Sequence, residues 1–151
     1  MNRAMTLLIV LTLFPALAPA VAADSGFQPL VVKFFATLEA GEPLEALNEL
    51  YATNPWMERA KDQVDKLKTQ FTNLPELVGA YRSHSLLAEE SVAERLVYMS
   101  YFVAYERQPI RFEFVFYRPR DKWILYSFSY DDKIDEDLKA QGRAASANKV
   151  H

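Results

Sequence analysis

Two histidines are the chain's only imidazoles for acid–base chemistry. His84 lies in a weakly strand-like run, with Arg82 and Leu86 on its side, and His151 stands in a polar C-terminal stretch. A catalytic histidine needs a pocket and a partner within hydrogen-bond reach. The sequence offers His84 no partner at a fixed spacing. We therefore favour a structural role for His84, and an enzyme that uses it with a nearby carboxylate is a less favoured alternative.

The supply of metal ligands is small. The chain contains no cysteine, and no two histidines stand at a metal-binding spacing. An acidic run extends from Asp131 to Asp137, but it lacks the alternating ligands, the glycine and the final glutamate of a calcium loop. Such a run favours the start of a helix, which we expect from Ile134 to Lys139. We predict no metal and no other cofactor.

The N-terminal residues indicate export. Arg3 precedes an apolar run from Met5 to Phe14, and Ala20-Val21-Ala22 fits the small residues of a signal peptidase site. The run is well short of the roughly 20 residues that span a bilayer. We predict a signal peptide over residues 1–23, a mature chain that begins at Ala23 or Asp24, and a periplasmic or secreted location without a stable membrane anchor.

The remaining chain has the length of one domain. Residues 24–139 are expected to form it, and residues 140–151 are expected to be a disordered tail. The absence of cysteine excludes a disulfide framework. The net charge of −3 argues against a nucleic-acid partner, because binding of that kind needs a basic surface.

Periodic apolar residues predict helices in the first half of this domain. Leu30, Phe34 and Leu38 recur at four-residue spacing, and Gly41 follows where a helix end is expected. A second short helix should come next. A longer series from Trp56 to Phe71 places charged residues between apolar ones and predicts an amphipathic helix.

The second half predicts an antiparallel sheet. Aromatic and β-branched residues mark strands at 95–106, 110–118 and 122–130, with a weaker strand at 81–89. The short connections favour hairpins. A register in which Tyr105 faces Ile110, Phe116 faces Leu125 and Phe114 faces Ser127 separates the side chains into two faces.

One predicted face is almost wholly apolar and should lie under the helices. Its members are Met99, Tyr101, Val103, Tyr105, Ile110, Phe112, Phe114, Phe116, Trp123 and Leu125. The other face mixes charges with more rings than a solvated sheet face normally carries. The residues on it that we expect to form an association surface are Phe102, Arg111, Glu113, Tyr126, Phe128 and Tyr130.

The order of helices and strands, with a final hairpin that reads FEFVFY and then KWIL, resembles the nuclear transport factor 2-like superfamily. The resemblance covers about residues 27–138. More narrowly, the chain resembles small exported bacterial proteins of that superfamily whose domain has no assigned function. It implies an α+β fold in which N-terminal helices pack on a curved antiparallel sheet and form a cone. That fold serves isomerases, dehydratases, ligand binders and interaction modules, so function must come from a site.

Isomerases of this superfamily use carboxyl groups and a tyrosine inside the cone. The predicted register puts Glu113 on the face opposite the helices and Glu106 at a turn, so neither carboxyl group lies with Tyr101 or Tyr105. The sequence therefore disfavours an isomerase.

Three functions remain as expectations. We favour a non-enzymatic interaction or assembly module that forms a homodimer, or binds an envelope protein, through the sheet face. The alternative is a binder of a small apolar ligand in the cone between sheet and helices, and a third is an enzyme that uses His84. The residues that would line a ligand cavity are Tyr101, Tyr105, Phe112, Phe114 and Trp123.

Overall fold

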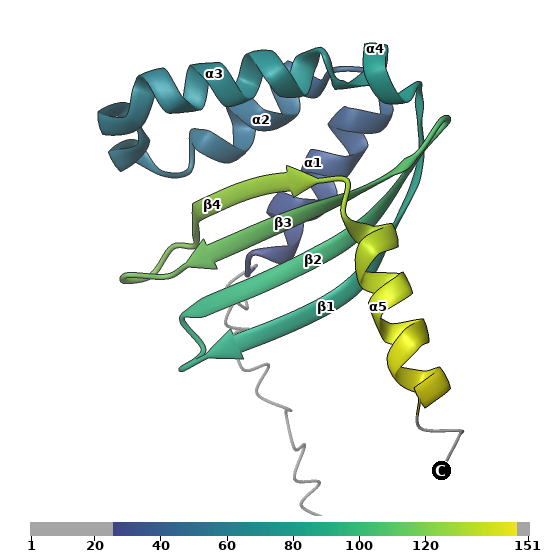
Figure 1. Ribbon diagram of the computed structural model, residues 1–151. Coiled ribbons are helices and arrows are strands. Elements are labelled where there is room, and N and C mark those ends of the chain that lie inside the picture. The colour runs from purple at the N-terminus through teal and green to yellow at the C-terminus, as the bar shows by residue number, and fades with distance from the viewer. Residues whose placement is uncertain (1–25, 148–151) are drawn as a thin grey trace, which may run out of the picture.

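A computed structural model describes residues 26–147. The predicted signal peptide, with both of its cleavage sites, lies outside the described residues, as does His151. The described chain consists of N-terminal helices, a four-stranded antiparallel sheet and a C-terminal helix (Figure 1). The predicted α+β class, with helices that precede the sheet, is confirmed.

Two helices form a hairpin at the start of the chain. Helix α1 (Gln28–Glu39) and helix α2 (Pro43–Tyr51) both carry a proline in the first turn, where its missing N–H is not needed. Gly41 joins them with a φ of 82°, a left-handed conformation that glycine adopts without steric cost. Helix α1 buries Phe34 and Leu38, as the four-residue spacing predicts, and α2 buries Leu47 and Leu50.

The predicted amphipathic helix divides into two elements. A 3-10 helix η1 (Pro55–Ala60) precedes helix α3 (Lys61–Thr72), and a short helix α4 (Leu74–Val78) leads into the sheet. Trp56 is exposed, with the Arg59 guanidinium 5.0 Å from its ring centre, so it does not extend the apolar stripe that ends in buried Phe71.

The sheet runs in chain order from β1 (Tyr81–Val92) through β2 (Leu96–Tyr105) and β3 (Pro109–Tyr117) to β4 (Ile124–Asp131). Helix α1 packs on one face, and helix α5 (Ile134–Ala147) crosses the other face at one end (Figure 1). Helix α5 is longer than predicted, so residues 140–147 are helical and do not belong to a disordered tail.

The register between β2 and β3 differs by two residues from the predicted one. Val103, not Tyr105, pairs with Ile110. The reason lies in the connection: the backbone N–H groups of Glu106 and Arg107 donate to Ala80 and Val78, which ties the loop to the start of β1 instead of closing a two-residue turn. A shift of two residues keeps every side chain on its predicted face.

A bulge corrects the predicted register between β3 and β4. Phe116 pairs with Leu125 as expected, but an irregularity follows, with Tyr126 as the extra residue, so Phe114 pairs with Phe128 and not with Ser127. The odd residue moves the rest of β4 to the opposite face. Phe128 is only 4% exposed and Tyr130 packs against the core, so neither belongs to the surface predicted for association.

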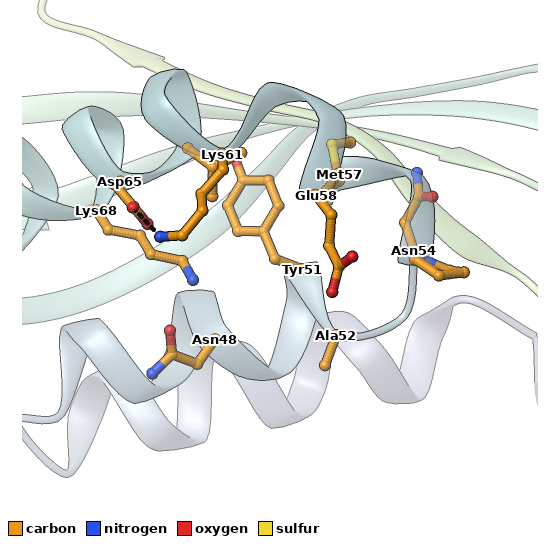
Figure 2. A pocket seen from close by; sticks show the side chains of 11 residues that line it. Asn48, Tyr51, Ala52, Asn54, Met57, Glu58, Lys61, Asp65 and Lys68 are labelled. Atoms are coloured by element: carbon orange, nitrogen blue, oxygen red, sulfur yellow. Dashed lines mark hydrogen bonds and ion pairs between the residues drawn. The ribbon is translucent and has the colours of Figure 1, made fainter.

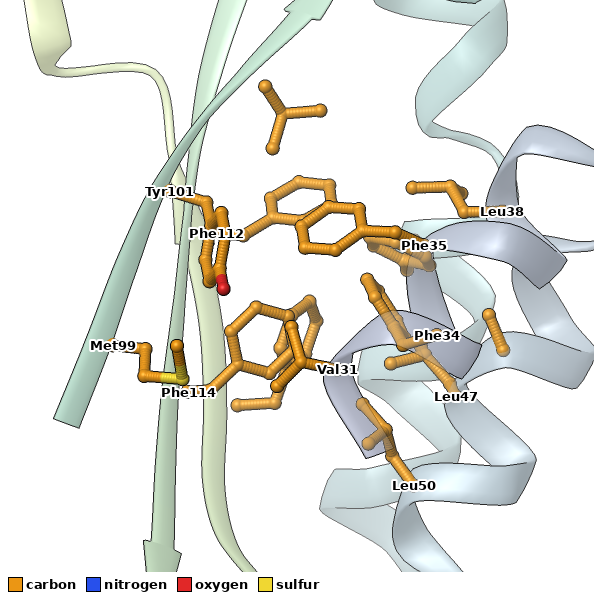
Figure 3. Close-up of a cluster of buried hydrophobic side chains, with 14 of the residues drawn as sticks. Val31, Phe34, Phe35, Leu38, Leu47, Leu50, Met99, Tyr101, Phe112 and Phe114 are labelled. Carbon is orange, nitrogen blue, oxygen red and sulfur yellow. The ribbon is translucent and has the colours of Figure 1, made fainter. Parts of the chain in front are cut away.

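The core lies between α1 and the helix-covered face of the sheet (Figure 3). The ring of Phe34 contacts the rings of Phe112, Phe114 and Phe128 at centre distances of 5.2 to 6.1 Å. Nine of the ten residues predicted under the helices are buried. The exception is Trp123, which precedes β4 and lies half-buried at the edge of the core.

Candidate functional site

Four of the five residues predicted to line a ligand cavity form packed core instead. Phe112 and Phe114 have no exposed surface, and the ring of Phe35 lies 4.9 Å from that of Tyr101. Burial raises the pKa of Tyr105, which is consistent with a tyrosine inside the core. Rings from α1 and the sheet therefore occupy the space in which a ligand was expected (Figure 3).

Trp123, the fifth predicted ligand-binding residue, lies apart from the other four. Its ring meets Phe27 edge-on at 5.2 Å, and the Arg118 guanidinium lies 5.1 Å from its centre. Together they line a shallow surface pocket of about 310 Å³. The five predicted residues therefore do not surround one common space.

His84 is held against the core by ring stacking. Its imidazole lies parallel to the ring of Phe35 at 3.7 Å, and its Nδ1 is 2.6 Å from the Tyr81 hydroxyl. Burial lowers the pKa of His84, while the charge of Glu39 opposes that change in part. The structure gives His84 an aromatic neighbour and a phenol, and within residues 26–147 no carboxylate hydrogen-bonds to it.

The open face of the sheet, opposite α1, carries the other predicted surface. Its side chains form rows that cross the strands, because directly paired residues project to the same side. Of the described elements only α5 crosses this face, and it does so at the end where β4 finishes (Figure 1). Phe102, Arg111 and Glu113 lie on this face as predicted.

The end of the open face nearest α5 carries a polar network that is internally paired. Arg111 donates to both carboxylate oxygens of Asp131 at 2.9 to 3.1 Å and to Asp137 of α5 at 2.6 Å. Glu113 accepts a hydrogen bond from the Tyr98 hydroxyl at 2.6 Å. The bonds to Asp131 and then Asp137 raise the pKa of Arg111, so it remains charged. This network fastens the start of α5 to the sheet and leaves these charges partnered.

The row at the opposite end is apolar, and we call it the apolar row. It consists of Val92, Leu96, Tyr117 and Ile124, one residue from each strand, paired in that order across the sheet. Tyr126, at the bulge, flanks it with its ring centre 6.4 Å from that of Tyr117. Val92 is 66% exposed and Tyr126 is 60% exposed. Leu96 and Tyr117, between them, are 37% and 38% exposed, and Ile124 is half-buried, so the row presents a partly exposed apolar strip to solvent.

The loops behind the apolar row are tied together. The backbone N–H of Arg118 donates to the carbonyl of Arg95 at 2.8 Å, and its guanidinium donates to the carbonyl of Glu94. These bonds join the β1–β2 and β3–β4 hairpins. The strand ends that carry the apolar row are therefore connected to each other by hydrogen bonds between these turns.

Alternation places Tyr117 and Ile124 on this face, but no sequence signal marks Val92 or Leu96. Val92, Leu96 and Ile124 lie at strand ends, and the weak first strand was expected to stop at Glu89. The observed β1 continues to Val92, and a turn follows in which Ala93 and Glu94 have φ values of 51° and 52°. Such values are unusual for residues other than glycine, so the strand's true end could not be read from residue type.

Within the described part of the chain, no cluster of three or more histidine, cysteine or acidic side chains could hold a metal. No helix between residues 26 and 147 is long and apolar enough to cross a membrane. In comparisons with family models, curated proteins and solved structures, nothing matches the chain.

Proposed function

We propose that this chain is an exported, non-enzymatic association module of the nuclear transport factor 2-like type, which pairs with a second copy of itself through the apolar row. The observation that carries the proposal is the exposure of apolar side chains in that row, which has no covering helix among the described elements. Contiguous apolar patches on soluble proteins mark interaction surfaces more often than scattered apolar residues do. Aromatic side chains such as Tyr117 and Tyr126 are enriched at such interfaces.

The charge distribution favours a second copy as the partner. In a two-fold contact the same surface meets itself, so it must be self-complementary. The apolar row contains no charged residue, and self-contact therefore brings no like charges together. The charged side chains around Arg111 have partners within the chain and do not require any from outside.

The other two functions have less support. A ligand inside the cone would have to displace fully buried rings such as Phe112 and Phe114. A general base at His84 would need a substrate pocket and a hydrogen-bonded carboxylate. The His84 ring instead stacks on Phe35 and bonds to the Tyr81 hydroxyl, and Glu39 acts on it only through its charge. Neither arrangement matches the chemistry that these functions require.

The test is the oligomeric state measured by light scattering after size exclusion. The mature protein should dimerise between about 1 μM and about 1 mM, a range that corresponds to binding free energies of roughly 8 to 4 kcal/mol. The double substitution Tyr117→Ser, Tyr126→Ser should give a folded monomer. Leu77→Ser, which removes an exposed apolar residue of α4 far from the row, should leave the dimer unchanged.

Two results would overturn the proposal. One is a wild-type protein that is monomeric at every concentration. The other is a dimer that survives the double substitution with unchanged affinity. If the wild type is monomeric but an envelope extract yields one partner that the double substitution releases, the surface binds a different protein and self-association is wrong.

Export requires a separate measurement. The signal peptide over residues 1–23 predicts that the exported protein begins at Ala23 or Asp24. N-terminal sequencing of protein recovered outside the cytoplasm checks this directly. Recovery of exported protein that still begins with Met1 would contradict the cleavage.

A further inference from the structure

We infer that the cleft between α2 and α3 binds a small amphipathic carboxylate. This cleft lies among the helices (Figure 2), and no residue of the apolar row lines it. Its volume is about 640 Å³, within the range of roughly 300–1,000 Å³ found for small-molecule sites. It is formed where α2 ends, η1 turns the chain and α3 returns alongside.

The centre of the cleft is apolar with one polar atom. The ring of Tyr51 lies in the middle, and Met57, Val64 and Ala52 add apolar surface (Figure 2). Burial raises the pKa of Tyr51, so its hydroxyl stays protonated at neutral pH. That hydroxyl makes no hydrogen bond to any residue in the described range and is available to a ligand.

One end of the cleft is cationic. Lys68 projects over Tyr51 with its ammonium nitrogen 5.5 Å from the ring centre, and none of the described carboxylates lies within ion-pair distance of it. Lys61, at the same end, is already paired with Asp65. These three side chains together carry a net charge of +1, which suits a single carboxylate.

The opposite end sets the direction of the ligand. Glu58 lines the cleft there, beyond Tyr51 (Figure 2). Its negative charge disfavours an anion beside it, so the carboxylate of the ligand should meet Lys68 and its apolar part should lie along Tyr51 and Met57. A multiply charged phosphate fits less well, because the cleft offers only one ammonium without an acidic partner.

The test uses 4-phenylbutyrate as the probe and 4-phenylbutan-1-ol as its uncharged match. Titration of the isotope-labelled mature protein should shift the backbone amide resonances of residues 48–68. The carboxylate should bind at least tenfold more tightly than the alcohol, because only the carboxylate can form a charge-assisted hydrogen bond with Lys68.

Two variants and one control complete the test. Lys68→Gln should reduce affinity for 4-phenylbutyrate about tenfold and leave affinity for the alcohol unchanged. Tyr51→Phe should weaken both probes modestly, because it removes the hydroxyl and keeps the ring. Lys139→Gln, on α5 and paired there with Asp135, should change neither.

Specific outcomes would overturn the inference. These are shifts confined to residues outside 48–68, equal affinities for the acid and the alcohol, or equal effects of Lys68→Gln and Lys139→Gln. The cleft and the apolar row are separate surfaces, so loss of dimerisation in the Tyr117→Ser, Tyr126→Ser variant should leave probe binding intact.

Discussion

Both faces of the sheet carry aromatic side chains, but these are buried on one face and exposed on the other. On the helix-covered face, rings such as Phe112 and Phe114 interlock with Phe34 and lose all contact with solvent. On the open face, the rings of Tyr117 and Tyr126 remain exposed next to aliphatic neighbours. Aromatic content alone therefore does not distinguish a core face from an exposed face. The difference lies in whether a helix packs against the rings.

The bulge in β4 is where the two faces are exchanged. Before it, alternation places Leu125 inward, and after it the inward positions are Phe128 and Tyr130. The extra residue, Tyr126, is left outside. Regular alternation would put three aromatic residues of β4 on the open face, whereas the bulge leaves only Tyr126 there.

The largest expected effect tests this exchange directly. Phe128→Ala should reduce the free energy of unfolding by about 3–5 kcal/mol, because it leaves a cavity between Phe34 and Phe71. Tyr126→Ala, two residues away, should cost less than about 1 kcal/mol in the monomer. Urea unfolding measures both changes. Similar losses for the two variants would place Phe128 and Tyr126 on equivalent faces and refute the bulge.

The fold and the core follow from sequence patterns, whereas the sites do not. Four-residue spacing identified the buried face of α1, and alternation placed Tyr101 and Phe112 on the inner face even though their register was two residues off. Alternation fails after an extra residue, which is why Phe128 was assigned to the surface. Nothing in residue type marks a bulge of this kind.

The cleft between α2 and α3 was also beyond sequence reasoning. Its residues come from α2, η1, α3 and the connection after α2. Tyr51 precedes and Lys68 follows the break between η1 and α3, which the apolar periodicity from Trp56 to Phe71 does not reveal. Side chains from separate elements meet only after the chain has folded. For the same reason, the sequence does not reveal whether side chains fill the space between helices and sheet, because those side chains come from elements far apart in the chain.

A buried amide fastens the helices to the edge of the covered face. Asn54 donates from Nδ2 to the carbonyl of Leu125 at 2.8 Å and accepts from the N–H of Trp56 at 3.0 Å. Asn54→Ala should therefore cost about 2 kcal/mol, because it leaves a buried carbonyl without its donor and removes a helix cap.

Thermal or urea unfolding checks the Asn54 prediction, with Asn48→Ala as the control. Asn48 lies in α2 and bonds only weakly to exposed Glu45 at 3.4 Å. Its loss should cost less than about 0.5 kcal/mol. Equal effects of the two substitutions would mean that the bond to Leu125 does not join the helices to the sheet.

Arg111, on the open face, should stabilise the attachment of α5 to the sheet and contribute little to the stability of the other elements. Arg111→Gln removes the ion pairs to Asp131 and Asp137, and we expect a stability loss of about 1 kcal/mol with faster amide hydrogen exchange in α5. Lys139→Gln, which breaks an exposed pair within α5, serves as the control. Unchanged exchange in α5 after Arg111→Gln would show that this network does not hold the helix.

The smallest effect concerns pH and the ring stack at the edge of the covered face. Because burial lowers the pKa of His84 in the folded chain, the unfolded chain, with a histidine pKa of about 6.5, takes up a proton first as pH falls. The stabilising contribution of neutral His84 is thus complete above pH 6.5 and is lost as pH falls through that value toward the folded pKa.

His84→Phe keeps a ring against Phe35 and removes the titration, so its urea midpoint should fall less than that of the wild type between pH 7.5 and pH 5.5. His151→Gln should behave like the wild type. A wild-type midpoint that rises relative to that of His84→Phe as pH falls would mean that the charge of Glu39 outweighs burial, and that His84 is stabilised as a cation.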